Sequence, residues 1–444
     1  MSFEAATYQV EQLISKKFLE IGDGYRAKNS ELSSTGIPFA RAANINDGFK
    51  FNDPDFFPEA DLAKVGNKIS KPGDVVFTSK GTVGRFALVG ANTPRFVYSP
   101  QLCFWRSLDQ KKLLPEYLYY WMNSQEFLNQ LGYLKGQTDM ADYVSLRDQR
   151  KITATIPSTD VQQLVVAVLK PIDDRIALLR KTNTTLEAIA QALFKSWFVD
   201  FDPVRAKQQG REPEGMDAEA AALFPDSFEE SELGLVPSGW RVAPVGDVVE
   251  IVGGGTPNTK ETEYWEPAEF AWTTPRDLSG LQSPVLLKTE RLLSAKGVLK
   301  VSSGLLPIGT LLLSSRAPIG YLAIAQIPLA INQGYIAILP SSQLPPLYMY
   351  FWCKQNMEVI KSRANGSTFM EISKKAFRPI PVQVPPVDLL DNFLDVANPI
   401  FTRLTENEKQ AQTLTTLRDT LLPRLISGQL RLPEAKTLLE ETIA

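Results

Sequence analysis

Two segments of the sequence end an apolar run with hydroxyl side chains, a cation and a turn of small residues. The first contains Thr78-Ser79-Lys80 before Gly81, and the second contains Ser314-Ser315-Arg316, 236 residues later. A tight turn exposes backbone N–H groups, which bind a phosphate oxygen well when a cation lies beside them. Lys80, Arg85 and Arg316 are therefore candidates for phosphate contacts, and a solvated hairpin turn is the alternative for each segment.

Polar side chains of the kind that read base edges occur in corresponding loops of the two halves. Arg pairs with guanine, and Asn and Gln pair with adenine, in the major groove of DNA. Taken singly, each such residue is more often an exposed polar side chain or a turn former. The candidates are Arg41, Asn44, Gln101, Gln137 and Thr138 in the first half, and Arg276, Asp277, Asn332, Gln333, Ser367 and Thr368 in the second.

Most catalytic arrangements are missing from the sequence. Histidine does not occur, which removes the commonest general base and metal ligand. Cys103 and Cys353 occupy non-equivalent positions and support neither a disulfide framework nor a zinc site. Residues 253–255 are a glycine triplet without the spacing of a nucleotide-binding loop, and no cofactor loop or catalytic tetrad of a methyltransferase is present. A loose nuclease pattern at Asp55 and Asp109 is one enzymatic alternative.

Residues 164–201 carry the pattern of a long helix that positions these loops. Apolar side chains recur at alternating steps of four and three residues, which is the seam of a coiled coil. An ordinary amphipathic core helix is the alternative. The polar residue at one seam position costs stability but fixes register. The seam comprises Ile172, Ile176, Leu179, Asn183, Leu186, Ala190, Leu193 and Trp197.

A second copy of the seam lies 228 residues further along the chain. Both helices carry a proline, Pro171 or Pro399, which must lie in a first turn or at a kink. Two such helices in one chain should bury their seams against each other. The second seam comprises Ile400, Leu404, Asn407, Ala411, Leu414, Arg418, Leu421 and Leu425.

The same order of short β-rich segments and one helix precedes each seam. Helices are expected at 115–132 and at the matching segment from Pro346, and the offset between the copies drifts from 236 to 228 residues. We therefore expect an α+β chain with a pseudo-twofold internal repeat. Its two tandem α/β domains are separated by two long helices that pair as an antiparallel coiled coil. The expected parts are 1–155, the first domain; 156–235, a helix and surface linker; 236–384, the second domain; and 385–444, the last helix and tail.

Charge is distributed unevenly over these parts. The chain of 444 residues has a net charge of −3, yet residues 1–155 hold 19 basic and 17 acidic side chains and residues 236–384 hold 14 and 10. The helical parts are acidic, so the two globular domains are the parts suited to face a polyanion. The N-terminus lacks the pattern of a secretory signal, which favours a cytoplasmic protein with no membrane partner.

The chain resembles the specificity subunit of type I restriction-modification systems. The resemblance covers essentially the whole length and is most specific from Pro171 to Trp240, including the segment FPDSFEESELGLVPSGW; the segments GGGTPNTKETEYW and LLSSRAPIG of the second domain also carry it. It implies a non-catalytic subunit that reads a bipartite site in double-stranded DNA, one half per target recognition domain. It also implies two modification (methyltransferase) subunits and restriction (translocase and nuclease) subunits as partners. These partners would carry S-adenosylmethionine, ATP and magnesium, none of which this chain would bind.

Two further expectations follow for such a subunit. Aromatic side chains flanked by charge at the end of the first long helix suit a docking surface for modification subunits. Those residues are Lys195, Trp197, Phe198, Asp200 and Phe201. The seam from Ile172 to Trp197 spans about 38 Å at roughly 1.5 Å per residue, so the half-sites should lie about one turn of DNA apart. A stand-alone metal-dependent nuclease and an architectural DNA-binding protein of another phage-defence complex are the alternatives.

Overall fold

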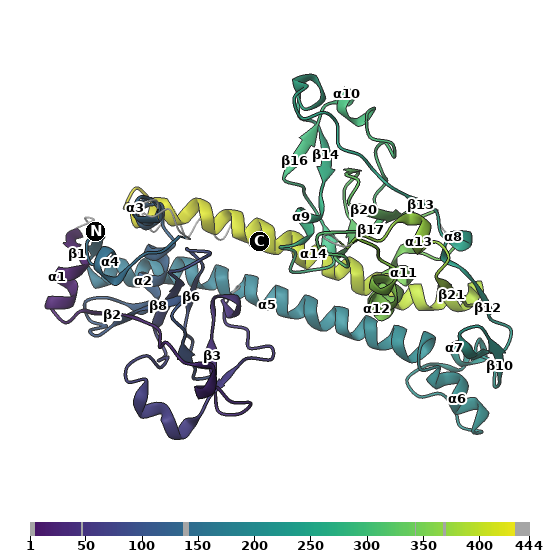
Figure 1. Cartoon of the computed structure of the whole chain (residues 1–444), viewed down its shortest axis with the longest axis horizontal. Helices are drawn as coiled ribbons and strands as arrows, with labels where there is room; N and C mark the ends of the chain where they lie inside the picture. The colour runs from purple at the N-terminus through teal and green to yellow at the C-terminus, as the bar shows by residue number, and fades with distance from the viewer. Residues whose placement is uncertain (1–4, 46–47, 136–141, 342, 367–369, 431–444) are drawn as a thin grey trace. The chain divides into compact units, whose positions relative to one another are not determined.

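The computed structural model describes residues 5–45, 48–135, 142–341, 343–366 and 370–430 (Figure 1). The chain divides into two compact units. The first unit holds residues 1–174 and 414–444, and the second holds residues 175–413. Each unit thus contains one globular domain and a section of both long helices. No described helix has the length and apolar character needed to span a membrane.

The first domain is built on an antiparallel sheet with strand order β2-β8-β5-β6. A smaller sheet, with order β4-β3-β7, lies in the same domain. Apolar and aromatic side chains of the strands form the core, and short helices close it. The strands are β2 (Leu19–Asp23), β3 (Ile37–Ala40), β4 (Phe56–Phe57), β5 (Asp74–Thr78), β6 (Phe86–Leu88), β7 (Val97–Tyr98) and β8 (Leu102–Ser107), with β1 (Ala5–Gln9) paired to β9 (Thr153–Pro157). The α-helices are α1 (Val10–Ser15), α2 (Pro115–Met122), α3 (Gln125–Lys135) and α4 (Leu146–Gln149).

The second domain repeats this plan with one added strand, β15, which pairs with β18 at one edge of the larger sheet. The larger sheet has order β13-β20-β17-β18-β15, the smaller one β16-β14-β19. Figure 1 shows β14, β16 and α10 projecting beyond the larger sheet. The strands are β12 (Arg241–Pro244), β13 (Ile251–Val252), β14 (Phe270–Thr273), β15 (Val285–Leu286), β16 (Arg291–Leu293), β17 (Leu311–Ser314), β18 (Leu322–Ala325), β19 (Ala330–Ile331), β20 (Tyr335–Ile338) and β21 (Pro381–Val384). The helices are α8 (Val245–Val248), α9 (Pro275–Leu278), α10 (Ala295–Val298), α11 (Pro346–Gln355), α12 (Met357–Ser362) and α13 (Lys374–Phe377).

The two long helices are α5 (Thr159–Phe198) and α14 (Val387–Ile426), each of 40 residues. Pro171 and Pro399 lie inside them, so the first-turn alternative for these prolines is excluded. Most seam side chains are buried, whereas Leu186, Leu193 and Ile400 are partly exposed. The buried ones are Ile172, Ile176, Leu179, Asn183, Ala190, Trp197, Leu404, Asn407, Ala411, Leu414, Leu421 and Leu425.

A pair of buried amides marks the seam in the second unit. Asn407 Nδ2 donates to Asn183 Oδ1 at 2.9 Å, and Asn183 Nδ2 donates to the Leu404 carbonyl at 3.1 Å. Arg175 lies beside Gln410, so residue numbers fall along α14 as they rise along α5. The helices therefore pack antiparallel, and the expected α+β fold with two domains and two paired helices is confirmed.

Two local expectations need correction. The helix expected over 115–132 is two helices, because the chain turns at Asn123-Ser124, where both side chains donate to carbonyls of the preceding turn. The linker after α5 is also structured. It contains α6 (Asp202–Gln208), α7 (Ala218–Ala222) and the hairpin of β10 (Phe228–Ser231) and β11 (Gly234–Pro237).

Candidate nucleic-acid interface

Each domain carries an open hollow at the end of its central strand. The first-domain hollow has a volume of about 490 Å³, and the second-domain hollow about 350 Å³. The polar lining of the first comprises Arg26, Asn29, Arg41, Lys80, Ser99 and Gln101. That of the second comprises Arg276, Ser279, Arg316, Tyr321 and Asn332. The predicted residues Arg41, Lys80 and Gln101 are thus brought together, as are Arg276, Arg316 and Asn332.

The cation of each turn stands at the same place in the two domains. Lys80 directly follows Ser79 after β5, and Arg316 directly follows Ser315 after β17. The next residue takes a left-handed backbone in both copies, with φ +81° at Gly81 and +54° at Ala317. Two different turn sequences therefore both place a left-handed residue directly after the cation.

Side-chain hydroxyls accept hydrogen bonds that bridge the two ends of each turn. Thr78 Oγ1 accepts the Arg85 N–H at 3.0 Å, and Ser314 Oγ accepts the Tyr321 N–H at 2.8 Å. Arg85 is exposed on the turn but does not line the hollow, whereas Tyr321 at the equivalent position does. The hydroxyl residues before the cation thus support the turn and are not themselves ligand contacts.

A backbone hydrogen bond joins each turn to the segment that precedes the neighbouring strand. Ser79 N–H donates to the Gln101 carbonyl at 2.8 Å, and Ser315 N–H donates to the Gly334 carbonyl at 2.8 Å. Gln101 and the 332–334 loop are therefore structural equivalents. This agrees with the sequence-based match between these two segments.

The charged side chains among the residues that line both hollows are all basic. Among the described residues that line them there is no Asp or Glu. Lys80 is exposed and has no ion-pair partner within the described part of the chain. A cation without a carboxylate beside it retains its full attraction for a phosphate group.

The three arginines predicted as contacts each lie near one carboxylate. Arg41 is paired with Asp55 at 2.5 Å, Arg316 with Glu371 at 3.5 Å and Arg276 with Glu290 at 3.7 Å. These pairs are at the surface, where an ion pair contributes about 0–1 kcal/mol. Such weak pairs can exchange a carboxylate for a phosphate or a base edge at small cost.

Two predicted base contacts act as structural capping residues. Asn44 Oδ1 accepts the Arg41 N–H at 2.8 Å, and Asn44 Nδ2 donates to the Lys50 carbonyl at 2.8 Å. Asp277 accepts the N–H of Thr274 and, through its other oxygen, that of Glu290. Both side chains satisfy backbone groups at the start of a short helix, which leaves them fewer free groups for a base edge.

The remaining amide candidates are partly engaged. Gln101 Oε1 accepts the Ala42 N–H at 3.1 Å, and Asn332 Oδ1 accepts the Gly334 N–H at 2.8 Å. Gln333 Oε1 accepts the Thr256 hydroxyl at 2.6 Å and does not line the hollow. Four other candidates lie outside the described residues. They are Gln137, Thr138, Ser367 and Thr368.

Sequence reasoning missed Arg26 and Asn29, which line the first-domain hollow beside Arg41. Both precede β3 in an irregular segment, with no counterpart in the repeat to single them out. Only the fold brings this segment to the hollow.

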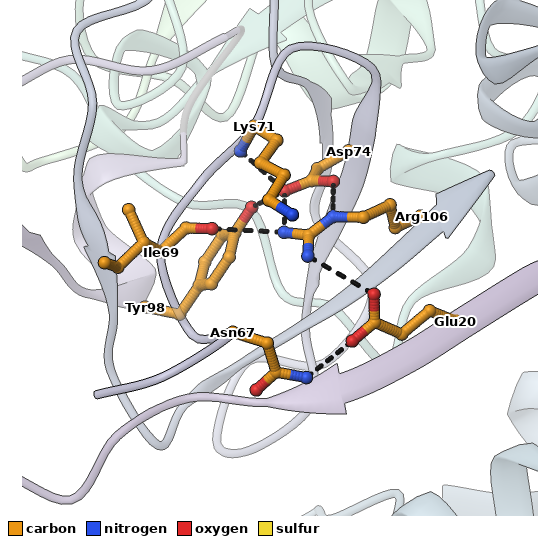
Figure 2. A network of polar contacts seen from close by, with 7 residues as sticks. All are labelled: Glu20, Asn67, Ile69, Lys71, Asp74, Tyr98 and Arg106. Carbon is orange, nitrogen blue, oxygen red and sulfur yellow. Dashed lines mark hydrogen bonds and ion pairs between the residues drawn. The ribbon is translucent and has the colours of Figure 1, made fainter. Parts of the chain in front are cut away.

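A polar network centred on the buried Asp74 lies in the first domain (Figure 2). Arg106 donates from Nε to Asp74 Oδ1 at 2.6 Å and from Nη2 to Asp74 Oδ2 at 2.8 Å. It also donates to Glu20 and to the Ile69 carbonyl. The Tyr98 hydroxyl donates to Asp74 Oδ2 at 2.6 Å, and burial raises the pKa of Tyr98. Tyr98 directly precedes the Ser99–Gln101 segment that lines the hollow, so the network fixes where that segment begins.

The second domain lacks this network. The strand registers place Thr310, Ile331 and Leu339 at the positions of Asp74, Tyr98 and Arg106. These residues form no buried ion pair. The same fold is thus held at this point by ion pairing in one domain and by apolar packing in the other.

The predicted docking aromatics belong to the core of the second unit. Trp197, Phe198 and Phe201 are 5%, 1% and 5% exposed. Phe198 packs edge-on against Tyr348 and Phe393, with ring centroids 5.1 and 5.2 Å apart. The hypothesis that these rings form an exposed docking surface is therefore wrong. The seam pattern does not show which other parts of the chain cover the rings.

The two charged members of the predicted docking group remain accessible. Lys195 is exposed and pairs with Asp200 at the end of α5. They are the part of the predicted docking group that stays available for a partner.

The carboxylates of the nuclease alternative are engaged locally. Asp55 pairs with Arg41, and Asp109 Oδ1 accepts the Lys111 N–H at 2.9 Å. No group of three or more potential metal ligands occurs among the described residues. The structure offers nothing in support of this alternative.

Comparison with known proteins identifies the same architecture. The family model of the type I restriction modification DNA specificity domain matches residues 16–188 and again residues 237–418. The HindI specificity subunit of Haemophilus influenzae is 26% identical over 415 residues, covering 83% of this chain and 89% of that protein. The MjaIX specificity subunit of Methanocaldococcus jannaschii is 36% identical over 185 residues, covering 41% and 42%.

A crystal structure of the specificity subunit of a type I system from M. genitalium has the same fold. It aligns over 96% of both chains with a TM-score of 0.54 and 15% sequence identity. The two family matches each contain one domain, its hollow and most of the long helix that follows. The chain therefore belongs to the specificity-subunit family of type I restriction-modification systems.

Proposed function

We propose that this chain reads a bipartite site in double-stranded DNA, with each domain contacting one half-site through its hollow. The observation that carries the proposal is the recurrence of one backbone frame that presents a cation beside an acid-free hollow. Residues that contact DNA must attract a polyanion and also distinguish bases. Both kinds of side chain line each hollow.

The two kinds of side chain have different roles in this proposal. Lys80 and Arg316, on the turns, bind phosphates and set the orientation of each domain. Arg41 and Gln101 in the first hollow, and Asn332 in the second, read base edges. A phosphate contact adds affinity for every sequence, whereas a base contact adds affinity for one.

Changing Lys80 or Arg316 to Ala tests the phosphate role. Each change should weaken binding to all DNA sequences alike and reduce the slope of affinity against salt by about one. Lys151→Ala and Lys361→Ala are matched controls, because these surface lysines are paired with Asp148 and Glu358 away from the hollows. A changed base preference with an unaltered slope would show that the cations read bases, and no effect at all would remove the hollows from the interface.

The chain acts, in this proposal, as the non-catalytic member of a complex. Two modification subunits that bind S-adenosylmethionine methylate adenine in the half-sites, and restriction subunits use ATP and magnesium to move and cut DNA. The exposed pair Lys195 and Asp200 is one contact for these partners. Copurification with a coexpressed modification subunit, and calorimetry showing no S-adenosylmethionine binding to the chain alone, test this division of labour.

The paired helices set the spacing of the half-sites in the same proposal. Each is 40 residues long, and a helix advances about 1.5 Å per residue. Deleting one heptad, residues 181–187, together with its counterpart 409–415 should shorten the unread spacer or abolish binding. Altered half-site bases with an unchanged spacer would refute this role.

A further inference from the structure

Arg291 lies on β16 with its guanidinium held between two indole rings. Its Cζ atom is 3.7 Å from the centre of the Trp265 ring and 5.2 Å from that of Trp272. The two indoles meet edge to face, with centroids 5.3 Å apart. Arginine stacked on an aromatic face loses side-chain freedom before it meets any ligand.

The two indole rings are themselves fixed. Trp265 Nε1 donates to the Asn258 carbonyl at 3.1 Å, and Trp272 Nε1 donates to the Gly255 carbonyl at 3.2 Å. Trp272 is 2% exposed. The platform under Arg291 is therefore rigid, and the guanidinium plane is oriented by it.

The donor edge of Arg291 is free. Arg291 is exposed, and within the described residues its guanidinium has no hydrogen-bond or ion-pair partner. Arg276 and Arg316, by contrast, are each near a carboxylate. Arg276 lines the second-domain hollow and pairs with Glu290, the residue next to Arg291. Arg291 thus presents an oriented guanidinium without hydrogen-bond or ion-pair partners among the described residues, one residue along the chain from the Arg276–Glu290 pair at the hollow.

The first domain builds the same feature with an arginine from a different segment. Trp272 pairs with Arg291 across β14 and β16, and at the equivalent place the Phe39 N–H donates to the carbonyl of Asp55. Asp55 thus takes the position of Arg291. The guanidinium over the Phe39 ring comes instead from Arg41, whose Cζ atom lies 5.6 Å from the ring centre. Both domains therefore keep an arginine over the same ring while the residue that supplies it differs.

We propose that Arg291 is a specificity-determining residue of the second domain that reads a guanine in its half-site. A planar fork of donors matches the O6 and N7 acceptors of guanine in the major groove, and the indole platform keeps the fork in one plane. A phosphate contact would not require a fixed plane. If the two domains read different bases at this site, the position that supplies the arginine is also expected to differ between them. This inference rests on the proposed role of the domains in DNA reading.

Arg291→Lys is the decisive variant, because it keeps the charge and removes the fork. The full chain, assembled with its modification subunits, is used to select bound sequences from a random DNA library. The variant should lose about tenfold or more of its discrimination at one position of the second half-site. The first half-site and the salt dependence should stay unchanged. Lys296→Arg, on α10 of the same lobe and paired with Glu263, is the control and should change nothing.

Other outcomes distinguish failure of this inference from failure of the proposed function. If Arg291→Lys selects the original sequence while Arg291→Ala weakens all sequences and lowers the salt slope, Arg291 binds a phosphate and the inference is wrong. Unchanged selection by both variants also overturns it and leaves the proposed function standing. If the unaltered complex selects no bipartite sequence, the proposed function itself fails. A retained first half-site preference shows that each variant has folded.

Discussion

Removing the cation from the buried network of the first domain should destabilise that domain alone. Arg106→Leu leaves Asp74, which is 0% exposed, without its two charge-assisted hydrogen bonds. Breaking a buried ion pair by removing one partner costs about 3–5 kcal/mol. The Tyr98 hydroxyl and the Lys71 N–H still reach Asp74, so we expect a loss near 3 kcal/mol.

A triple change should be much milder. Asp74→Thr, Tyr98→Ile and Arg106→Leu together introduce the residues that the second domain has at these positions. Replacing a whole buried ion pair with apolar side chains is often neutral or stabilising. The triple variant should therefore recover most of the stability lost by Arg106→Leu, although its three side chains enter a core shaped for others.

Hydrogen exchange measured by mass spectrometry separates the two domains in the full chain. Peptides from β5 and β8 should exchange about a hundredfold faster in Arg106→Leu at 3 kcal/mol, and peptides from β17 and β20 should be unchanged. Equal destabilisation by the single and triple variants would refute the reasoning. It would show that shape, and not an unpaired carboxylate, limits stability here.

Three further predictions concern the helix seam, the core and the thiols. Asn407→Leu removes the donor to the buried Asn183 Oδ1 atom and should lower the free energy of unfolding in urea by about 1–3 kcal/mol. The Asn183→Leu/Asn407→Leu double variant should recover this loss. Phe198→Ala should cost about 3–5 kcal/mol by the same measurement, because the ring is 1% exposed; a cost below 1 kcal/mol would place it outside the core. Burial raises the pKa of the Cys103 and Cys353 thiols, so neither should react with a thiol reagent at neutral pH until the chain unfolds. Since these folded-state pKa values are raised, the thiols remain protonated in the native chain while unfolded thiols ionise, and stability should fall as pH rises above about 8.5.

The repeat and the helix seam were predictable because each is visible as a pattern in the sequence itself. A period of alternating four and three residues needs only the chain itself to be recognised, and its second copy shows what the first one packs against. The position of Lys80 and Arg316 on equivalent turns was predictable for the same reason. Burial of Phe198 and Phe201 was not, since the pattern marks an apolar face without showing how far the surrounding core extends.

The amide and carboxylate candidates were harder to assign. Asn44 and Asp277 have the side chains that read bases, but each lies four residues after a strand end and caps the start of a short helix. The Thr274-x-x-Asp277 spacing is the local signal of such a cap and could have identified the role of Asp277. Arg26 and Arg291 gave no signal, because their importance depends on segments that only tertiary structure brings together.

The central claim is that each domain reads one half of a bipartite DNA site. Replacing residues 240–380 with the matching domain of a relative, and mapping methylated sites in cells that carry the modification subunits, tests this claim most directly. We expect one half-site to change to that of the relative while the other half-site and the spacer stay the same. A map in which both half-sites change would contradict it.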